Sequence, residues 1–180
     1  GQLWEMNPDG SNPRQVTDIP DGINGYVYAP DMSKIVYLKD VQLEPTVQDL
    51  YPDLPKAKAR IVDDQFYRHW NDWVDAYTHL FIADYVPAQP ITTGKDIMEG
   101  ERWESPVRPW GGVEQLAWTK DGKKLIYTCR KKIGIDYAES TNTDLYAYNT
   151  ENGETVNLTE GMMGYDKNPV ISPNGRYMAW

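Results

Sequence analysis

The sequence predicts an all-β fold of β-propeller blades, which are four-stranded antiparallel sheets, in an incomplete ring of roughly two to three blades. Two kinds of strand–turn–strand segment alternate along its 180 residues, and one segment of each kind supplies the four strands of a blade. The composition agrees, because thirteen Tyr and seven Trp against two Phe suit half-buried sheet surfaces. Pro and Gly are spread along the chain, as turns between many short strands require.

The first kind of segment is a pair of apolar strands around a tight turn. It occurs at residues 23–37, 115–127 and 169–180. The second and third copies carry Asp121-Gly122 and Asn174-Gly175 in the turn, and these pairs are hairpin signals because both residue types tolerate positive φ. The first copy has Met32-Ser33 at that place, so a weaker turn is expected there.

The second kind of segment begins with a short strand and ends in Thr. It occurs at residues 3–17, 80–92 and 145–159. Alternation of the two kinds predicts a half blade at 2–18, a blade at 23–94 with an insertion at 40–79, a blade at 113–160 and a half blade at 167–180. Because a blade buries its faces only against its neighbours, and a closed ring has about four to eight blades, this arrangement is incomplete.

Both ends of the chain fall on apolar strand segments. It opens on Leu3-Trp4-Glu5-Met6 and stops at Met178-Ala179-Trp180. An intact domain seldom ends on an unpaired apolar edge, so we expect either a piece of a longer protein or a second copy that supplies the missing strands. The same edges predict that the isolated segment self-associates.

The insertion at 40–79 interrupts the repeat. Residues 41–54 indicate a short helix or loop, because Pro45 and Pro52 act as breakers. For the remainder we expect a long hairpin with residues 65–73 as one arm and 78–84 as the other, and a helix over 62–73 is the alternative.

Arg68, His69, Trp70 and Trp73 form the densest group of functional side chains in the insertion. Long insertions in compact folds tend to carry function, so these four residues are the candidate substrate-facing or domain-facing site. The alternative is that the aromatic residues only pack the insertion onto its blade, with Arg68 paired to Asp72.

No complete active site is found in the sequence. None of its serines lies in a Gly-x-Ser-x-Gly context, and Ser172 precedes Pro173-Asn174-Gly175 as a turn residue. His69 and His79 lie near the ends of the expected hairpin, where a metal would need further carboxylates, so no metal site is expected. No phosphate loop, dinucleotide fingerprint or Cys-x-x-Cys pair occurs, and no cofactor is predicted.

Charge and apolar patterning exclude other classes of protein. A formal net charge of −9 argues against nucleic-acid binding, which needs a basic face. No apolar run of about 18 residues exists, so no membrane span is expected. The single Cys129 lies in the apolar run 125–129, which predicts a buried strand thiol rather than a disulfide.

The turn motifs carry a resemblance to known propellers. Ser172-Pro173-Asn174-Gly175-Arg176, Thr119-Lys120-Asp121-Gly122-Lys123 and Ala29-Pro30-Asp31-Met32-Ser33 resemble the repeats of the prolyl oligopeptidase family and of TolB-like propellers. More narrowly, residues 67–75, followed by His79-Leu80-Phe81, look like the Arg-His-Trp-Asp-x-Trp and His-Leu-Phe signature of bacterial dipeptidyl aminopeptidases and acylaminoacyl peptidases in that family. Asn71-Asp72 departs slightly from the signature. The approach Trp110-Gly111-Gly112-Val113 to the next blade is also similar to those enzymes.

The resemblance implies a two-domain serine peptidase as the parent protein. The propeller would gate and orient peptide substrates, and a C-terminal α/β-hydrolase domain would supply the Ser, Asp and His that do not map onto this chain. It also implies a periplasmic or secreted location. The alternative is a TolB-like propeller that binds a protein or peptide partner. A propeller lyase with a metal held by several His residues is disfavoured, since there are only two His.

Overall fold

The structure is a computed structural model that describes residues 1–64 and 68–180. Short strands dominate it. The strands are β1 (Trp4–Glu5), β2 (Arg14–Gln15), β3 (Gly25–Tyr28), β4 (Lys34–Val41), β5 (Arg68–His69), β6 (Asp72–Trp73), β7 (Tyr77–Asp84), β8 (Lys95–Asp96), β9 (Leu116–Trp118), β10 (Lys124–Cys129), β11 (Asp144–Asn149), β12 (Thr155–Asn157), β13 (Val170–Ile171) and β14 (Met178–Ala179). The helical elements are α1 (Val47–Leu50), the 3-10 turn η1 (Val113–Gln115) and α2 (Gly134–Glu139).

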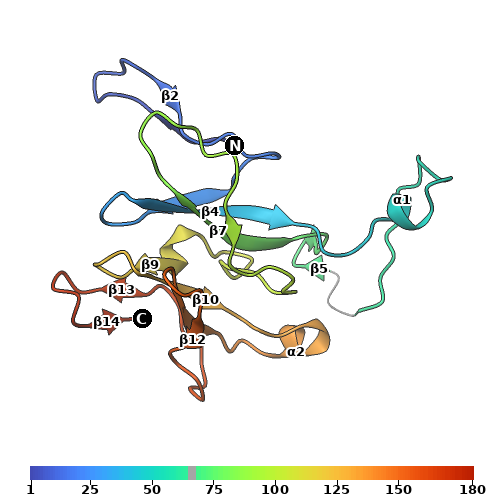
Figure 1. Ribbon diagram of the computed structural model, residues 1–180. Helices are drawn as coiled ribbons and strands as arrows, with labels where there is room; N and C mark the ends of the chain where they lie inside the picture. The colour runs from blue at the N-terminus through green and yellow to red at the C-terminus, as the bar shows by residue number, and fades with distance from the viewer. Residues whose placement is uncertain (65–67) are drawn as a thin grey trace.

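Two four-stranded antiparallel sheets form the centre of the molecule. Their strand orders are β3-β4-β7-β8 and β9-β10-β11-β12. Within each sheet, the strands therefore lie side by side in the order in which they occur along the chain. The two sheets lie one over the other (Figure 1). Each is the meander expected of a propeller blade, and the predicted all-β fold of propeller blades is confirmed.

Period-2 alternation in the sequence explains why the sheets stack. Along β4, Val36 and Leu38 face the other four-stranded sheet. Ile35 and Tyr37 point to the opposite face, because successive side chains in a strand alternate. β10 alternates in the same way, with Leu125, Tyr127 and Cys129 in the cluster between the sheets and Ile126 on the outer side. Both faces of each sheet are therefore apolar and need cover.

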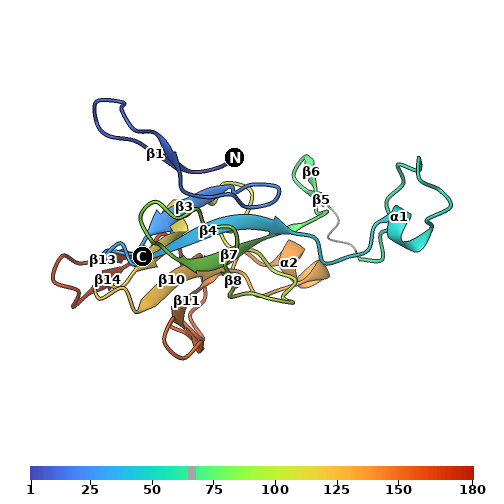
Figure 2. The same ribbon diagram turned by 45° about the horizontal axis from the view of Figure 1, so that its top comes forward.

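Two-stranded sheets cover the outer faces. The β1–β2 pair contributes Leu3 and Val16 to the cluster on one face of the β4 sheet. On the far side, Ile171 and Met178 of β13–β14 pack against the outer cluster of the β10 sheet. Figure 2 shows the β1–β2 pair above the β4 sheet and the β10 sheet beneath it. Each two-stranded pair thus covers one outer face of the stacked sheets.

The turns follow the predicted chemistry at two of the three repeats. Gly122 and Gly175 have φ of +68° and +70°, and Gly122 N donates to Thr119 O at 2.8 Å. In the first copy Met32 takes the same role with φ +59°. The missing glycine is replaced by a methionine in the left-handed region, which is uncommon for a non-glycine residue.

The insertion differs from the expected long hairpin, and that prediction is wrong for the described residues. β5 and β6 pair with each other, His69 opposite Asp72, while β7 pairs with β4 over its full length. Residues 65–67 of the expected arm lie outside the described residues. The alternative helix is wrong too, since 62–64 and 68–73 are not helical. The β7 segment pairs with β4 because its apolar side chains complete both faces of that sheet.

Cys129 is fully buried in β10, as the sequence predicts. Its Sγ donates to Glu104 O at 3.4 Å, and burial raises the pKa of the thiol. Among the described residues, no helix is both long and apolar enough to cross a bilayer.

A polar cluster around Glu5 joins the β1–β2 pair to the next sheet. Glu5 Oε2 accepts from Arg14 Nη2 at 2.5 Å and from Tyr85 Oη at 2.9 Å, and Oε1 accepts from Tyr28 Oη at 2.5 Å. Burial raises the pKa of Glu5, but the hydrogen bonds from Tyr28, Arg14 and Tyr85 outweigh it, so the pKa lies below its ordinary value of 4.5.

We therefore expect Glu5 to stabilise the fold in a pH-dependent way. A carboxyl whose folded pKa is depressed contributes fully above its ordinary value, and the contribution is lost as the pH falls through the folded pKa. Glu5→Gln should lower the free energy of unfolding by roughly 2 kcal/mol at pH 7, and the difference from wild type should shrink below pH 4.5. Urea unfolding at both pH values measures this, with the exposed Glu99→Gln as control. A difference independent of pH would contradict the assignment.

Candidate functional site

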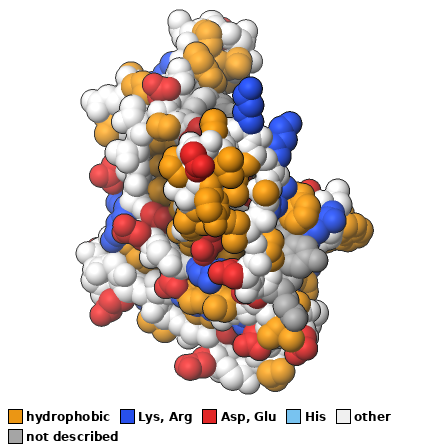
Figure 3. All heavy atoms as spheres, turned by 90° about the vertical axis from the view of Figure 1, so that its right-hand side faces the viewer, with side chains coloured by type: hydrophobic (Ala, Val, Ile, Leu, Met, Phe, Trp, Pro, Cys, Tyr) orange, Lys and Arg blue, Asp and Glu red, His pale blue; other side chains and the backbone are white. Residues whose placement is uncertain are grey.

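The insertion is raised from the sheet by the two longest strands. β4 and β7 remain paired past Gly25, the first residue of β3. In this extension Asp40 lies opposite Thr78 and Val41 lies opposite Tyr77. From there the chain runs out to α1, which projects from the body of the molecule (Figures 1 and 2). Figure 3 faces this side and shows hydrophobic side chains gathered on it. The exposed large apolar residues of the insertion's arm are Leu50, Tyr51, Leu54, Ile61 and Val62.

The arm is ordered by local interactions. Thr46 caps α1, because its Oγ1 accepts from Asp49 N at 3.2 Å while the Asp49 carboxylate accepts from Thr46 N at 2.7 Å. This capping box is a known start signal for a helix. Farther along, Arg102 Nε lies 3.0 Å from Glu44 Oε1, which ties the base of the arm to the segment that links the two blades.

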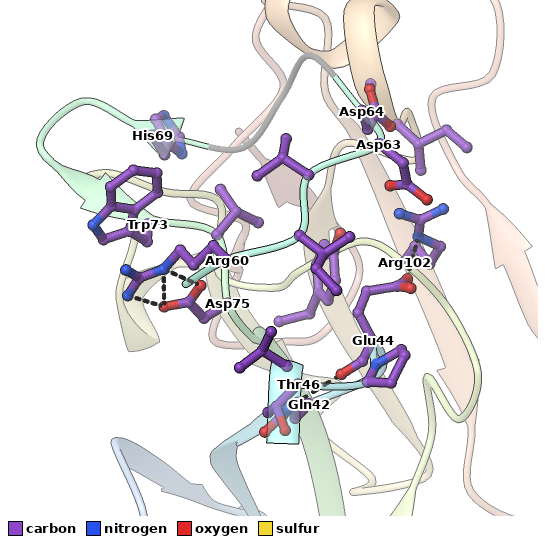
Figure 4. Close-up of a pocket in the computed structure, with 18 of the residues that line it drawn as sticks. Gln42, Glu44, Thr46, Arg60, Asp63, Asp64, His69, Trp73, Asp75 and Arg102 are labelled. Atoms are coloured by element: carbon purple, nitrogen blue, oxygen red, sulfur yellow. Dashed lines mark hydrogen bonds and ion pairs between the residues drawn. The ribbon is translucent and has the colours of Figure 1, made fainter. Parts of the chain in front are cut away.

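A pocket of about 600 Å³ lies between the insertion and the two blades. Three parts of the chain line it: the insertion, through residues within 42–48, 57–64 and 73–77 together with His69, the inter-blade connector, through residues within 102–108, and the start of α2, through residues within 132–137. Figure 4 shows the charged side chains of Arg60, Asp75 and Arg102 around it. The pocket therefore has a mixed lining of apolar walls and paired charges, as ligand pockets commonly do.

Arg60, Trp73 and Asp75 form one wall of the site, and Arg68 lies against Trp73. Arg60 Nε and Nη2 donate to the Asp75 carboxylate at 2.9 Å and 2.8 Å. The Arg60 guanidinium lies 4.4 Å from the centre of the Trp73 ring and that of Arg68 lies 5.0 Å from it. Arg68 donates to Asn71 O at 3.0 Å and forms no ion pair with Asp72 within the described part of the chain. The proposed Arg68–Asp72 pair is thus replaced by stacking on Trp73.

Glu104 is a buried carboxylate at the floor of the site. Its side chain is 7% exposed, and Oε2 lies 3.0 Å from Arg108 Nε. Oε1 accepts from Tyr137 Oη at 3.1 Å and from Arg108 N at 3.3 Å. Burial raises the pKa of Glu104, and the positive charge of Arg108 opposes that rise. The residue thereby joins the connector to α2.

His69 points inward to this carboxylate. Its Nδ1 lies 4.0 Å from Glu104 Oε1, and its ring meets the edge of Tyr137 with centroids 5.9 Å apart. Burial lowers the pKa of His69, and the charges of Arg130 and Arg108 lower it further. Both influences favour the neutral imidazole, whose packing against Tyr137 holds the β5–β6 hairpin against the connector.

Trp70 points the other way, to solvent. It is 69% exposed, and it meets Trp110, 77% exposed, edge to face with ring centroids 5.0 Å apart. Trp70 has φ +56°, which is an outlier for so bulky a side chain. The four predicted site residues thus split: His69 and Trp73 line the pocket, Arg68 stacks on Trp73, and Trp70 pairs with a residue from the connector.

Reasoning from the sequence missed Glu104, Arg108 and Tyr137 as site residues. The available signal was the length of residues 97–112, which join β8 to η1 without regular structure. Such long connections in compact domains are usually functional.

His79 has a structural role. It is fully buried, its Nδ1 lies 2.8 Å from Asp96 Oδ2, and its Nε2 lies 3.0 Å from Glu101 O. Over residues 1–64 and 68–180, no group of three or more His, Cys, Asp or Glu is placed to hold a metal ion. His69 and His79 therefore serve separate parts of the fold.

The fold and site together define a propeller segment with a pocket-bearing insertion. No protein-family model matches the chain. It is 48% identical over 179 residues to dipeptidyl-peptidase 5 of Porphyromonas endodontalis, covering 99% of this chain and 26% of that protein. It is likewise 48% identical over 159 residues to dipeptidyl-peptidase 5 of Porphyromonas gingivalis, covering 88% of this chain and 23% of that protein.

More distant similarities exist. Dipeptidyl-peptidase 5 of Aspergillus fumigatus is 25% identical over 144 residues, covering 70% of this chain and 20% of that protein. The crystal structure of TolB from Acinetobacter baumannii has 19% sequence identity and a TM-score of 0.37, covering 99% of this chain and 42% of that one. The chain spans about a quarter of the length of the curated Porphyromonas relatives it matches.

Proposed function

We propose that this chain is the propeller segment of a dipeptidyl-peptidase 5-like serine peptidase of the prolyl oligopeptidase family. The observation that supports it is the 48% identity across 99% of the chain to a relative of that name. In this proposal the segment gates and orients peptide substrates, and an α/β-hydrolase domain elsewhere in the longer protein supplies the catalytic Ser, Asp and His. We also propose export to the periplasm or the outside of the cell, as the resemblance implies.

The site supports a role in handling peptides. The pocket presents apolar walls together with guanidinium and carboxylate groups, which are the partners that side chains, carboxyl groups and amide groups of a peptide require. Arg68, His69, Trp70 and Trp73 are proposed as the substrate-facing or domain-facing residues, two of them beside the pocket and one exposed on the tip of the hairpin.

Peptidase assays on the longer protein and on the isolated chain test this function. Dipeptidyl reporter substrates should be cleaved by the longer protein and not by the 180-residue chain. In the longer protein, His69→Ala should loosen the hairpin and raise cleavage of long peptides relative to a dipeptidyl reporter. Trp4→Ala, an exposed aromatic on β1, is the matched control. A longer protein without peptidase activity would favour the alternative, a TolB-like propeller that binds a protein or peptide.

The isolated chain is expected to form dimers or larger assemblies. β14 and β2 are edges of two-stranded sheets, and Val170 and Tyr177, on or beside the β13–β14 pair, are 63% and 69% exposed. Exposed apolar edges pair with other chains. Light scattering at increasing concentration should show mass growth, and a stable monomer at high concentration would contradict this proposal.

A further inference from the structure

The pair of exposed tryptophans lies beside a second hollow of the surface. Trp70 lies at the tip of the β5–β6 hairpin and Trp110 in the inter-blade connector. A pocket of about 790 Å³ is lined by the residues beside both indoles: His69 next to Trp70, and Pro109 and Gly111 on either side of Trp110. The start of β3 forms another part of its wall, so it opens beside an edge strand of the sheet.

Two tight turns hold the indoles outward. Gly111 N donates to Val107 O at 3.0 Å, and Val107 N donates to the buried Gln115 Oε1 at 2.8 Å. A Cβ at Gly111 would collide with the Val107 carbonyl, so the loop closes this tightly only with glycine. On the other side, the positive φ of Trp70 costs conformational energy. Both turns therefore present a large apolar side chain to water at a cost to stability.

The unpaired charge of this hollow is negative. Arg108 is its only Arg or Lys in the described residues, and two carboxylates balance it, Glu104 at 3.0 Å and Asp40 at 3.7 Å. Asp72 and Glu114 also line the hollow, are exposed, and form no ion pair in the part of the chain that the structure describes. Burial lowers the pKa of His69, which favours its neutral form. Glu114 Oε1 accepts a hydrogen bond from Gly112 N at 2.8 Å and keeps its negative charge. Indole faces attract cations through the ring quadrupole, and the carboxylates of Asp72 and Glu114 also attract cations.

We propose that Trp70 and Trp110, with Asp72 and Glu114, bind a cationic group of a peptide. The cation is either the ammonium of the peptide N-terminus or a Lys or Arg side chain, since both offer the same charge to an indole face. The inference rests on the proposed function in peptide handling and adds a preference for basic peptides. It places a recognition site on the propeller segment itself, in residues outside the main pocket.

Titration of the chain with short peptides tests the site through intrinsic tryptophan fluorescence at low micromolar protein concentration. The probes are Ala-Lys-Ala-Ala, its norleucine analogue, and the N-acetylated form of each. The norleucine analogue keeps the apolar stem and removes the side-chain charge, while acetylation removes the terminal charge. We expect the doubly neutral peptide to bind weakest, and the singly changed peptides identify which cation is held.

Two protein variants locate the binding. Asp72→Asn with Glu114→Gln keeps all seven Trp and the shape of the side chains, and it should weaken binding of Ala-Lys-Ala-Ala and remove most of its salt dependence. Trp110→Ala should weaken binding about two- to fivefold, the worth of one exposed cation–π contact. Trp4→Ala and Glu99→Gln are the matched controls and should leave binding unchanged.

The proposal is overturned if the doubly neutral peptide binds as well as the charged one, if the Asp72→Asn/Glu114→Gln variant binds like wild type, or if none of the peptides binds the chain. Any of these results is compatible with a longer protein that cleaves dipeptidyl reporters. Failure of the cation site is thereby distinguished from failure of the proposed function.

Discussion

Replacing Leu125 by alanine is expected to lower the free energy of unfolding by about 3 kcal/mol, because a fully buried leucine in a dense core leaves a cavity. Leu125 is 0% exposed and lies in β10, in the cluster between the two four-stranded sheets. Its loss removes apolar contacts from both blades at once. Urea unfolding monitored by circular dichroism measures the change.

Leu54→Ala is the matched control for this experiment. Leu54 is 50% exposed on the arm of the insertion, and the same chemical change there should stay within about 0.5 kcal/mol of wild type. If Leu125→Ala cost no more than the control, the two sheets would not share the core described above.

Replacing Glu104 by alanine is expected to have a comparable effect, about 3 kcal/mol, because removing one partner of a buried ion pair leaves the other charge without compensation. Arg108 is left with Asp40 at 3.7 Å, and its side chain is 29% exposed, so water recovers part of the loss. Tyr137 Oη loses the Glu104 carboxylate as an acceptor. Thermal and urea unfolding of the variant measure the effect.

The same substitution should release the β5–β6 hairpin. His69 packs between Glu104 and Tyr137, so hydrogen exchange of the amides of Arg68–Trp73 should speed up more than that of β10. Glu99→Ala, an exposed carboxylate nearby in the sequence, should change neither property. Equal exchange rates in hairpin and sheet would mean that Glu104 does not position the insertion.

The repeat pattern was readable from the sequence because a blade strand has a strict period of two. An unbroken apolar run such as Ile35-Val36-Tyr37-Leu38 predicts a strand covered on both faces, because successive side chains point to opposite faces of the sheet. Asp121-Gly122 and Asn174-Gly175 likewise signal their turns by local chemistry alone. Met32 carries no such signal, and its positive φ arises from the strands that it joins.

The insertion was much less readable. Its strands are two residues long, too short for a period to be recognised, and the partner of β7 is β4, far away in the sequence. That pairing is decided by which side chains complete the faces of the sheet. The predicted blade over 23–94 already had the segment from residue 80 as its third strand, as β7 is, but the added hairpin between residues 65–73 and 78–84 was wrong for the described residues.

By itself, the sequence determined the all-β fold, the alternation of the segments, the burial of Cys129 and the group of residues to inspect in the insertion. Only the tertiary structure decided that Glu104 and Arg108 lie beneath His69, and that Trp70 meets Trp110 across 40 positions of sequence. The physical reason is the range of the interactions. Strand period and turn type depend on neighbouring residues, whereas a buried ion pair and an aromatic contact depend on how two separate loops close over the stacked blades.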